Sequence, residues 1–307
     1  KCCVLNVYDF QGGNRWLGNH PRKYYYLSLN MKIFPLTGVL GAEIFDADVT
    51  EESSFLSIFE AFVEYGVIAI RDQHITPEEQ IRFAKRFGKI SINRFFASHP
   101  QHPEIAMLVK EPHQRVAIGE GWHTDHSYDE IPCRCSILHT IETPQTGGDT
   151  GFSSMSAAFT ALSDSMKNFL RARYAQHSSR HVFGYSADDH ESHKDGRIGN
   201  PELATQDVIH PVVIKHPLSG RECLFVNREF TTHIEGLHED ESKCILQFLY
   251  SHASDIAFTC RIRHLPGTIT IWDNQGTWHK AVNDYDGHRR VMHRITVEGV
   301  ALEPSRR

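Results

Sequence analysis

The 307-residue sequence predicts a mainly-β protein in which a double-sheet barrel forms the core and helices surround it. The C-terminal third alternates polar and apolar residues over Thr268–Trp272 and Arg290–Val297, as strands do. The predicted helices are well separated, and the sequence shows neither a βαβ rhythm nor an internal repeat. All-β barrels often reach this length as one unit, so we expect a single domain over residues 31–307. Residues 1–30 have no clear period, and we interpret them as an N-terminal extension.

The first half of the predicted domain combines strands with two helices. From Ile33 the pattern predicts a strand and a turn, then a helix around Glu51–Tyr65. The apolar run Val67–Ile70 is typical of a short buried strand. Thr76-Pro77-Glu78-Glu79 is a capping box with proline at the first helical position, so a second helix should run from there to about Phe87.

Two further helical regions and one long loop are predicted in the middle of the chain. The first region covers about Ser156–Arg173. The second covers Glu239–Ala253 and places on one face the apolar residues Cys244, Ile245, Phe248 and Leu249. Between them, Tyr185–Asp207 is polar and rich in His, Asp and Gly. We interpret this segment as a mobile surface loop whose length is typical of lids.

Composition argues against several classes of partner. The net charge of -6 and the pI near 6.4 offer no basic face for phosphate backbones, so we expect no nucleic acid partner. No apolar run approaches the roughly 20 residues that span a bilayer, and the first residues lack the apolar core of a signal peptide. We therefore expect no membrane association and a cytoplasmic location. The seven cysteines are odd in number and scattered, which favours reduced thiols, and the Cys133-Arg134-Cys135 spacing is not that of usual zinc sites.

His123 and Asp125 are the first candidates for a metal site. They lie two residues apart, and on a strand this spacing turns both side chains to the same face. A second histidine from far along the chain would complete a set of two histidines and one carboxylate, which leaves three adjacent coordination positions open on Fe(II). His279 can supply it, because it follows the strand predicted at Thr268–Asp273. Isolated His-x-Asp pairs are common by chance in a chain with 21 histidines. The prediction of a metal site therefore depends on His279 and the sequence around it.

Arg290 and Arg294 strengthen this interpretation. They lie four residues apart on the last long predicted strand, and therefore on one face of it. Planar guanidinium groups in that arrangement can bind carboxylates or sulfonates through paired hydrogen bonds.

Several spaced motifs occur in an order that is far more specific than any one of them: Trp122–Asp125, Gly147–Thr150, Phe225–Asn227, Trp272–Asn274 and His279–Arg294. With these motifs the sequence resembles, from about Pro35 to Val297, the taurine dioxygenase/2,4-D dioxygenase (TauD/TfdA) family of Fe(II)/2-oxoglutarate oxygenases. The resemblance implies a double-stranded β-helix (jelly-roll, cupin-like) core. It also implies hydroxylation of an sp3 C–H bond with O2, coupled to decarboxylation of 2-oxoglutarate to succinate and CO2. Members of the family often form dimers or tetramers.

The resemblance also implies roles for individual residues. His123, Asp125 and His279 match the iron ligands. Arg290, eleven residues after the distal histidine, matches the partner of the distal carboxylate of 2-oxoglutarate. The hydroxyl of Thr150 matches its second donor.

For the substrate, Arg294 resembles the residue that holds the anionic group, and Phe183 and Phe230 match apolar wall positions. Taurine-specific members carry a His, a Tyr and an Asn where this sequence has Asn93, Phe96 and Gly119. Taurine is therefore not the expected substrate, since buried polar groups give large discrimination. Other stretches are similar to the branch that cleaves aryloxypropionates: Pro35–Ile44, Gly148–Phe152 and Phe258–Arg261. The expected substrate is a small anion, either a sulfonate, an alkyl sulfate or an aryloxyalkanoate.

Two other classes of function remain open from the sequence. Two histidines and one carboxylate can also bind Zn²⁺ and activate water for hydrolysis, although such an enzyme needs neither Arg290 nor Thr150. A non-catalytic barrel that binds a ligand is the other alternative. We set aside His190 and His193 as surface residues, and His126 because alternation along a strand points it away from the proposed ligands.

Overall fold

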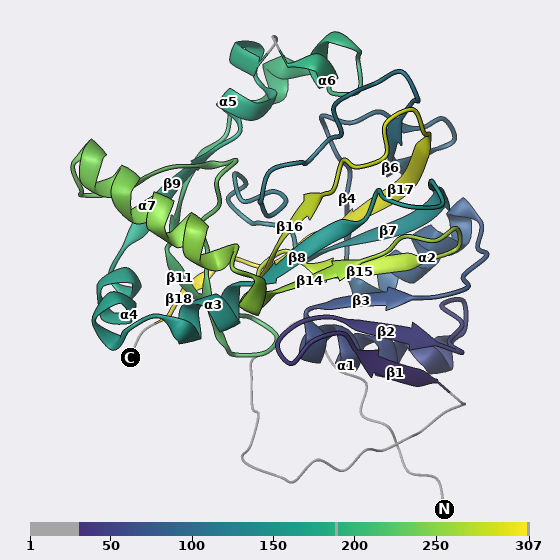
Figure 1. The fold of residues 1–307 in the computed structure, drawn as a ribbon, viewed down its shortest axis with the longest axis horizontal. Coiled ribbons are helices and arrows are strands. Elements are labelled where there is room, and N and C mark those ends of the chain that lie inside the picture. The colour runs from purple at the N-terminus through teal and green to yellow at the C-terminus, as the bar shows by residue number, and fades with distance from the viewer. Residues whose placement is uncertain (1–30, 188–189, 306–307) are drawn as a thin grey trace, which may run out of the picture.

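The computed structural model describes residues 31–187 and 190–305, which form a mainly-β fold with helices around it (Figure 1). The predicted fold class is confirmed, whereas the extension predicted for residues 1–30 lies outside the described residues. The largest sheet has nine strands and is called the major sheet below. Its hydrogen-bonded order is β1 (Lys32–Pro35), β2 (Ala42–Phe45), β3 (Val67–Ile70), β15 (Ile269–Asp273), β7 (Cys135–Glu142), β17 (Arg290–Val297), β6 (His102–Lys110) and β5 (Ser98–His99), and β4 (Ile90–Ser91) also pairs with β17.

Three smaller sheets have three strands each. The one that faces the major sheet, called the minor sheet below, has the order β14 (Thr259–Ile262), β8 (Thr150–Ser154) and β16 (Thr277–Ala281). The other two have the orders β10 (Asp207–Pro211), β9 (Tyr174–Ser178), β13 (Thr231–Ile234) and β12 (Glu222–Leu224), β11 (Val213–Lys215), β18 (Glu303–Pro304).

The α-helices are α1 (Phe55–Tyr65), α2 (Pro77–Phe87), α3 (Met155–Ala161), α4 (Asp164–Arg171), α5 (Arg180–Phe183), α6 (Glu191–Lys194) and α7 (Glu239–Ala253). Short 3₁₀ turns occur at η1 (Glu52–Ser54), η2 (Tyr185–Ala187), η3 (Pro201–Leu203) and η4 (Ile256–Phe258). In Figure 1, α3, α4 and α7 lie on the left of the barrel and α5 and α6 above it.

The helices α1 and α2 follow the local signals of the sequence. Thr76 Oγ1 accepts a hydrogen bond from Glu79 N (3.3 Å), and the Glu79 carboxylate accepts one from Thr76 N (2.8 Å), so the predicted capping box starts α2. Gly66 ends α1 with φ of 69°, a conformation that favours glycine. Aromatic rings from both helices, including Phe55, Phe62 and Phe87, pack with the buried isoleucines of the major sheet.

The helix predicted over Ser156–Arg173 is wrong in one respect, because the structure has two helices there. Leu162 is extended (φ -69°, ψ 155°) and ends α3. Ser163 then starts α4, since its Oγ accepts a hydrogen bond from Met166 N at 3.3 Å. A serine inside an apolar periodic stretch can cap a new helix as well as continue the old one, and the periodicity alone does not decide between them.

Helix α7 begins and ends as predicted, but its buried face is partly different. Leu249 is buried as expected, together with Leu246 and Ala253, whereas Cys244 is exposed and Phe248 is 46% exposed. The predicted loop Tyr185–Asp207 contains η2, α6 and η3 among its described residues, so it is more regular than expected.

Apolar side chains between the major and minor sheets hold the barrel together. Phe152 and Ile262 of the minor sheet pack against Trp272 and Met292 of the major sheet, and all four are buried. The rings of Phe152 and Trp272 also lie next to the ring of His279, with centroids 6.3 and 4.8 Å away, so this layer packs against a candidate site residue.

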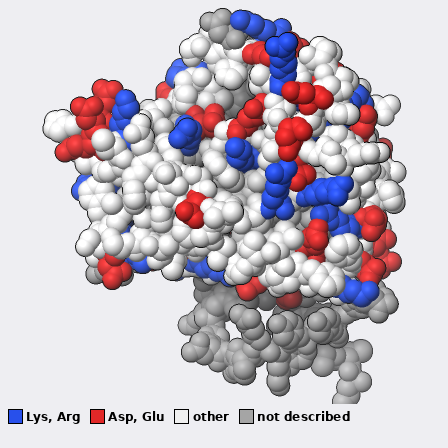
Figure 2. Space-filling model, viewed as in Figure 1, with Lys and Arg blue, Asp and Glu red and all other residues white. Residues whose placement is uncertain are grey.

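Charged side chains of both signs are interspersed on the face drawn in Figure 2. Exposed pairs such as Lys89–Glu298 and Arg221–Glu64 each contribute at most about 1 kcal/mol, so the cores carry the stability. Among the helices of the described ranges, none is both long and apolar enough to traverse a bilayer.

Buried histidines predict a loss of stability in weak acid. The pKa lies below its ordinary value in His139, His177, His210, His264 and His293. Burial is the main cause, and with His99 and His139 it lowers the pKa of His293 to about 4. The unfolded chain, with an ordinary histidine pKa of about 6.5, binds protons first. We expect the free energy of unfolding to decrease as pH falls from about 6.5 towards 4. Urea denaturation at a series of pH values measures it, and a constant value between pH 7 and 5 would contradict the expectation.

Candidate metal centre and its cavity

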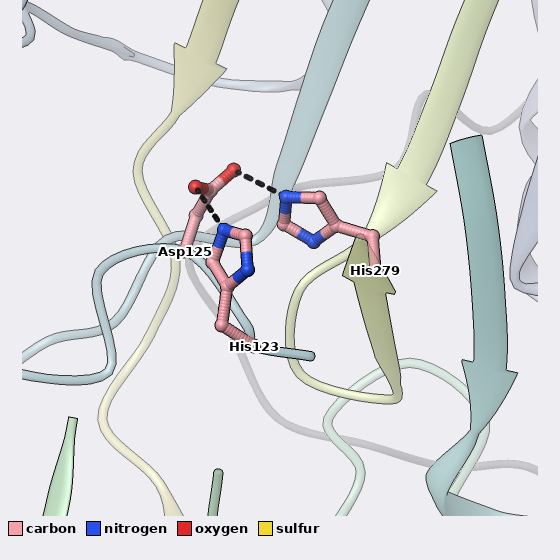
Figure 3. A group of neighbouring side chains, drawn as sticks. All are labelled: His123, Asp125 and His279. Carbon is pink, nitrogen blue, oxygen red and sulfur yellow. Dashed lines mark ion pairs between the residues drawn. The ribbon is translucent and has the colours of Figure 1, made fainter. Parts of the chain in front are cut away.

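Three buried side chains, His123, Asp125 and His279, converge at one place between the sheets (Figure 3). One ligand atom from each lies within 4.8 Å of the others. The Nε2 atom of His123 is 3.9 Å from Asp125 Oδ1, and that of His279 is 3.8 Å from Asp125 Oδ2. Within the described ranges, no other group of three or more His, Cys, Asp or Glu residues comes this close.

Backbone pairing brings the two histidines together. His123 N donates to His279 O (3.1 Å) and His279 N donates to His123 O (2.8 Å), an antiparallel bridge that joins the loop to β16. The expectation of a regular strand through His123 and Asp125 is wrong, because Asp125 begins a turn. The two side chains nevertheless converge.

The protonation of the imidazoles suits metal binding. Nδ1 of His123 lies 2.8 Å from Gly121 O, and because a carbonyl only accepts, this nitrogen carries the proton and Nε2 presents a lone pair. Burial and then the neighbouring His123 hold the pKa of His279 well below its usual range. A neutral imidazole is the form that coordinates a metal ion.

The carboxylate of Asp125 is held in its ionised form. Burial opposes ionisation, but Arg294 and then the neighbouring histidines outweigh it, and the pKa of Asp125 lies well below its usual range. Arg294 Nη1 donates to Oδ1 at 3.1 Å, and Ser136 Oγ donates to Oδ2 at 2.8 Å. Asn274 Nδ2 in turn donates to Ser136 Oγ at 3.0 Å. Two imidazoles and one carboxylate at this spacing fit a divalent first-row metal ion.

Ser136 orients this carboxylate, and its loss should be measurable. We expect Ser136→Ala to weaken divalent metal binding by about 10-fold, within the range for partners that orient metal ligands. Competition between the protein and a chromogenic chelator for Mn²⁺ measures the effect. Ser251→Ala, at an exposed position of α7, is the matched control. Equal affinities of the two variants would show that Ser136 does not orient the ligand.

Arg290, which is also buried, lies in the wall of a cavity of about 660 Å³ whose lining includes Thr150 and the three metal-ligand candidates. Its Nε donates to Gly148 O at 3.1 Å, and burial lowers its pKa. Thr150 Oγ1 lies 2.8 Å from Nε2 of His264. Burial, followed by the charges of Arg290 and Arg71, keeps the pKa of His264 low, so this ring is neutral.

His264 was not among the site residues predicted from the sequence. It lies between β14 and the Pro266-Gly267 turn, and its contact with Thr150 joins positions 114 residues apart. A contact between positions so far apart leaves no periodic pattern in the sequence.

The predicted substrate residues also line the cavity. The guanidinium of Arg294 lies 4.9 Å from the ring centroid of Phe96. Asn93 Oδ1 accepts hydrogen bonds from Phe95 N and Phe96 N, both at 2.9 Å, so its carbonyl oxygen shapes the turn that presents Phe96. This leaves only the amide nitrogen of Asn93 for other partners.

Aromatic rings form the rest of the wall. Phe183, from α5, stacks on Phe95 with centroids 4.2 Å apart. Phe230 packs edge-to-face on Tyr128 at 4.8 Å. The segment between β9 and β10 also contributes His190 and Ile198 to the lining, so the predicted lid segment borders the cavity. His190 is exposed, as predicted, and lies at the edge of this cavity.

His126 contradicts the expectation from strand alternation, because it is buried and lines the same cavity. The backbone at His126 has φ of 58°, which ends the alternation that the prediction assumed. Cys133 and Cys135 are buried thiols whose pKa is raised by burial, and Cys133 Sγ donates to Asp125 O at 3.3 Å.

The model of the taurine catabolism dioxygenase TauD, TfdA family matches residues 32–296. The chain belongs to this family. The TauD/TfdA resemblance is thereby confirmed, and so is the expectation of an enzyme.

Relatives within the TauD/TfdA family have diverse names. The chain is 30% identical over 277 residues to an alkylsulfatase of Acinetobacter baylyi, with 88% of this chain and 85% of the relative covered. It is 30% identical over 283 residues to an (S)-phenoxypropionate/alpha-ketoglutarate-dioxygenase of Sphingobium herbicidovorans, with 87% and 94% covered. A crystal structure of a taurine dioxygenase from Burkholderia xenovorans superposes with a TM-score of 0.73 at 27% identity, with 89% and 92% covered.

Proposed function

We propose that the chain is an Fe(II)- and 2-oxoglutarate-dependent dioxygenase that hydroxylates an sp3 C–H bond of a small anionic substrate, with release of succinate and CO2. The observation that carries the proposal is the buried set of His123, Asp125 and His279 in one cavity with two buried guanidinium groups, Arg290 and Arg294. A dioxygenase family and a relative named for alpha-ketoglutarate support it.

His123, Asp125 and His279 would hold the metal ion through two imidazole Nε2 atoms and one carboxylate oxygen. Bound Fe(II) supplies the activation of O2, which protein side chains alone do not achieve. The His123–His279 backbone bridge and the Ser136 hydrogen bond would keep the three side chains in place around the ion, and a set of only three protein ligands would leave coordination positions for other groups.

Arg290 and Thr150 would bind the distal carboxylate of 2-oxoglutarate. Arg290 is buried and forms no ion pair within the described part of the chain, so its positive charge is available to an anion. A charge-assisted hydrogen bond in such a desolvated place is stronger than one in water. His264 would keep the Thr150 hydroxyl in position.

Arg294 would bind the anionic group of the primary substrate, and Asn93, Phe96, Phe183 and Phe230 would surround its body. Aromatic walls exclude water and hold an apolar group by packing, which positions one C–H bond towards the metal. An alkyl or aryl body with one anionic group fits this wall, so alkyl sulfates, sulfonates and aryloxyalkanoates are the proposed classes. The names of the relatives agree with these classes.

We also propose that residues 31–307 form one domain, because the major sheet joins β1 from one end of this range to β17 from the other.

A homodimer or homotetramer is proposed as the assembly, and exposed apolar residues near the end of α7, Phe248 and Ile256, support a contact with another copy. Sedimentation velocity tests it. The proposed location is the cytoplasm, and the free thiols of Cys133, Cys135 and Cys223 support it.

Succinate formation tests the proposed reaction. The protein is supplied with Fe(II), ascorbate, 2-oxoglutarate and O2, together with each of a panel of alkyl sulfates, sulfonates and aryloxyalkanoates. We expect at least one member to increase succinate formation well above the rate without substrate. The protein loaded with Zn²⁺ alone is the control. Substrate loss with Zn²⁺ in the absence of 2-oxoglutarate would overturn the proposal in favour of a hydrolase.

A further inference from the structure

We propose that His126 forms a polar subsite of the cavity, where its Nε2 accepts a hydrogen bond from a hydroxyl or amino group of the substrate. The inference rests on the proposed function and deepens it. The substrate would carry a hydrogen-bond donor in addition to the anionic group for Arg294.

The backbone holds His126 in an uncommon conformation. Its φ is 58°, and the other non-glycine residues with positive φ in the described ranges are Asp46, Asp72 and Asn200. Asp and Asn tolerate this conformation through local hydrogen bonds, whereas for histidine it costs on the order of 1 kcal/mol. This turn follows directly after Asp125 and is closed by Asp129 N, which donates to His126 O at 3.0 Å. The consequence is that His126 is among the residues that line the cavity.

The hydrogen bond at Nδ1 of His126 determines whether Nε2 is a donor or an acceptor. Nδ1 of His126 lies 2.9 Å from Asp129 Oδ2. Asp129 also forms an ion pair with Arg94 through Oδ1, so it is a carboxylate and can only accept. Nδ1 therefore carries the proton, and in the neutral ring Nε2 presents a lone pair.

That lone pair has no partner in the protein. Nε2 of His126 is buried and forms no hydrogen bond within the described ranges, and the whole residue is only 4% exposed. A buried polar atom without a partner is destabilising, and such atoms are rare. One face of the ring is covered by Tyr128, whose centroid lies 5.5 Å away, and Asp129 occupies the Nδ1 edge. His126 is one of the residues that line the cavity, and we infer that a partner for Nε2 approaches from there.

A purely structural role is the competing explanation. In that case the His126–Asp129 bond only fixes the turn after Asp125, and substrates with and without a donor group bind equally well. A subsite, in contrast, discriminates between them, because a polar group built to pair with the substrate rejects the analogue that lacks the partner.

Matched ligand pairs separate these explanations without turnover. The protein is loaded with Mn²⁺ and 2-oxoglutarate under anaerobic conditions. Calorimetry then measures binding of short alkanesulfonates and their hydroxylated or aminated counterparts, such as ethanesulfonate and 2-hydroxyethanesulfonate. We expect at least one substituted member to bind about 10-fold more tightly than its partner. The affinity ratio is the dissociation constant of the unsubstituted member divided by that of its substituted partner. This ratio should fall to about 1 in His126→Phe, which keeps a ring against Tyr128 but has no nitrogen.

Two further measurements depend on the tautomer. Asp129→Asn can donate to Nδ1 and so move the proton to Nε2, and it should also lower the ratio although His126 is present. Nitrogen-15 spectra of the Zn²⁺-loaded protein at pH 8 should show His126, identified by its absence in His126→Phe, with the proton on Nδ1. A proton on Nε2 would overturn the proposal, and so would a ratio near 1 for every pair in the wild type or an unchanged ratio in His126→Phe.

The outcomes also separate this inference from the proposed function. Binding of unsubstituted sulfonates and 2-oxoglutarate-dependent succinate formation report on the proposed function alone. If these hold and the ratio is 1, only the His126 subsite fails. If no member of any pair binds, the proposed anion site and the subsite are both rejected.

Discussion

His279→Ala is expected to abolish 2-oxoglutarate-dependent succinate formation and to lower divalent metal affinity by more than about 100-fold, the upper range for partners that only orient a ligand. His279 is one of the two proposed nitrogen ligands, and it is held by the backbone bridge to His123 and by burial. Alanine leaves the β16 backbone in place but removes the only imidazole that reaches Asp125 from the minor sheet among the described residues. Metal content after reconstitution and gel filtration measures the loss directly.

The control for this prediction is His288→Ala. His288 is exposed, lies outside the cavity lining and belongs to the same stretch of chain. It should retain both metal and activity. If His279→Ala binds Mn²⁺ as tightly as His288→Ala does, His279 is not a ligand and the assignment of the centre is wrong.

Elements encoded by neighbouring residues were predictable from the sequence. The capping box at Thr76 starts α2, the run Val67–Ile70 forms β3, and α7 has the expected ends. In each case the signal is a contact or a period within a few residues. The same holds for Arg290 and Arg294, whose spacing of four on one strand places both in the cavity.

Features that depend on distant parts of the chain were not predictable. The helix break at Ser163 depends on whether the surrounding packing favours Ser163 as the cap of a new helix or as part of a continuous one. His126 enters the cavity only because its backbone adopts a positive φ, which no alternation pattern contains. His264 reaches Thr150, and Ser136 reaches Asp125 and Asn274, across strands that tertiary structure brings together.

Arg294 also pairs with Asp125, a contact that the four-residue spacing of Arg290 and Arg294 did not predict. Arg294 is the main cation that keeps the pKa of Asp125 low, and its Nη1 lies 3.1 Å from the carboxylate. The proposed substrate anchor and a proposed metal ligand therefore share one electrostatic environment. A metal ion bound by Asp125 would compete with Arg294 for the carboxylate, which makes more of the guanidinium available to an anion.

Substitution of Arg290 or Arg294 is expected to have the second large effect, on the KM values of the two ligands. We expect Arg290→Ala to raise the KM for 2-oxoglutarate by about 30-fold or more while the KM for the primary substrate changes little, and Arg294→Ala to do the reverse. The magnitude follows from the loss of a buried charge-assisted interaction, which costs about 2 kcal/mol or more. Arg290 has no carboxylate partner in the described part of the chain, so its charge is available to the proposed co-substrate. Steady-state kinetics with each ligand varied in turn measures both constants.

Lysine at position 294 sharpens this comparison. Arg294→Lys keeps the positive charge near Asp125 but loses the planar fork that binds an oxyanion through two hydrogen bonds. If the fork holds the substrate, Arg294→Lys should raise the substrate KM nearly as much as Arg294→Ala. If only the charge beside Asp125 matters, lysine should restore the wild-type value. Equal effects of Arg290→Ala and Arg294→Ala on both constants would refute the division of roles, because both cations would then act on the cavity as a whole.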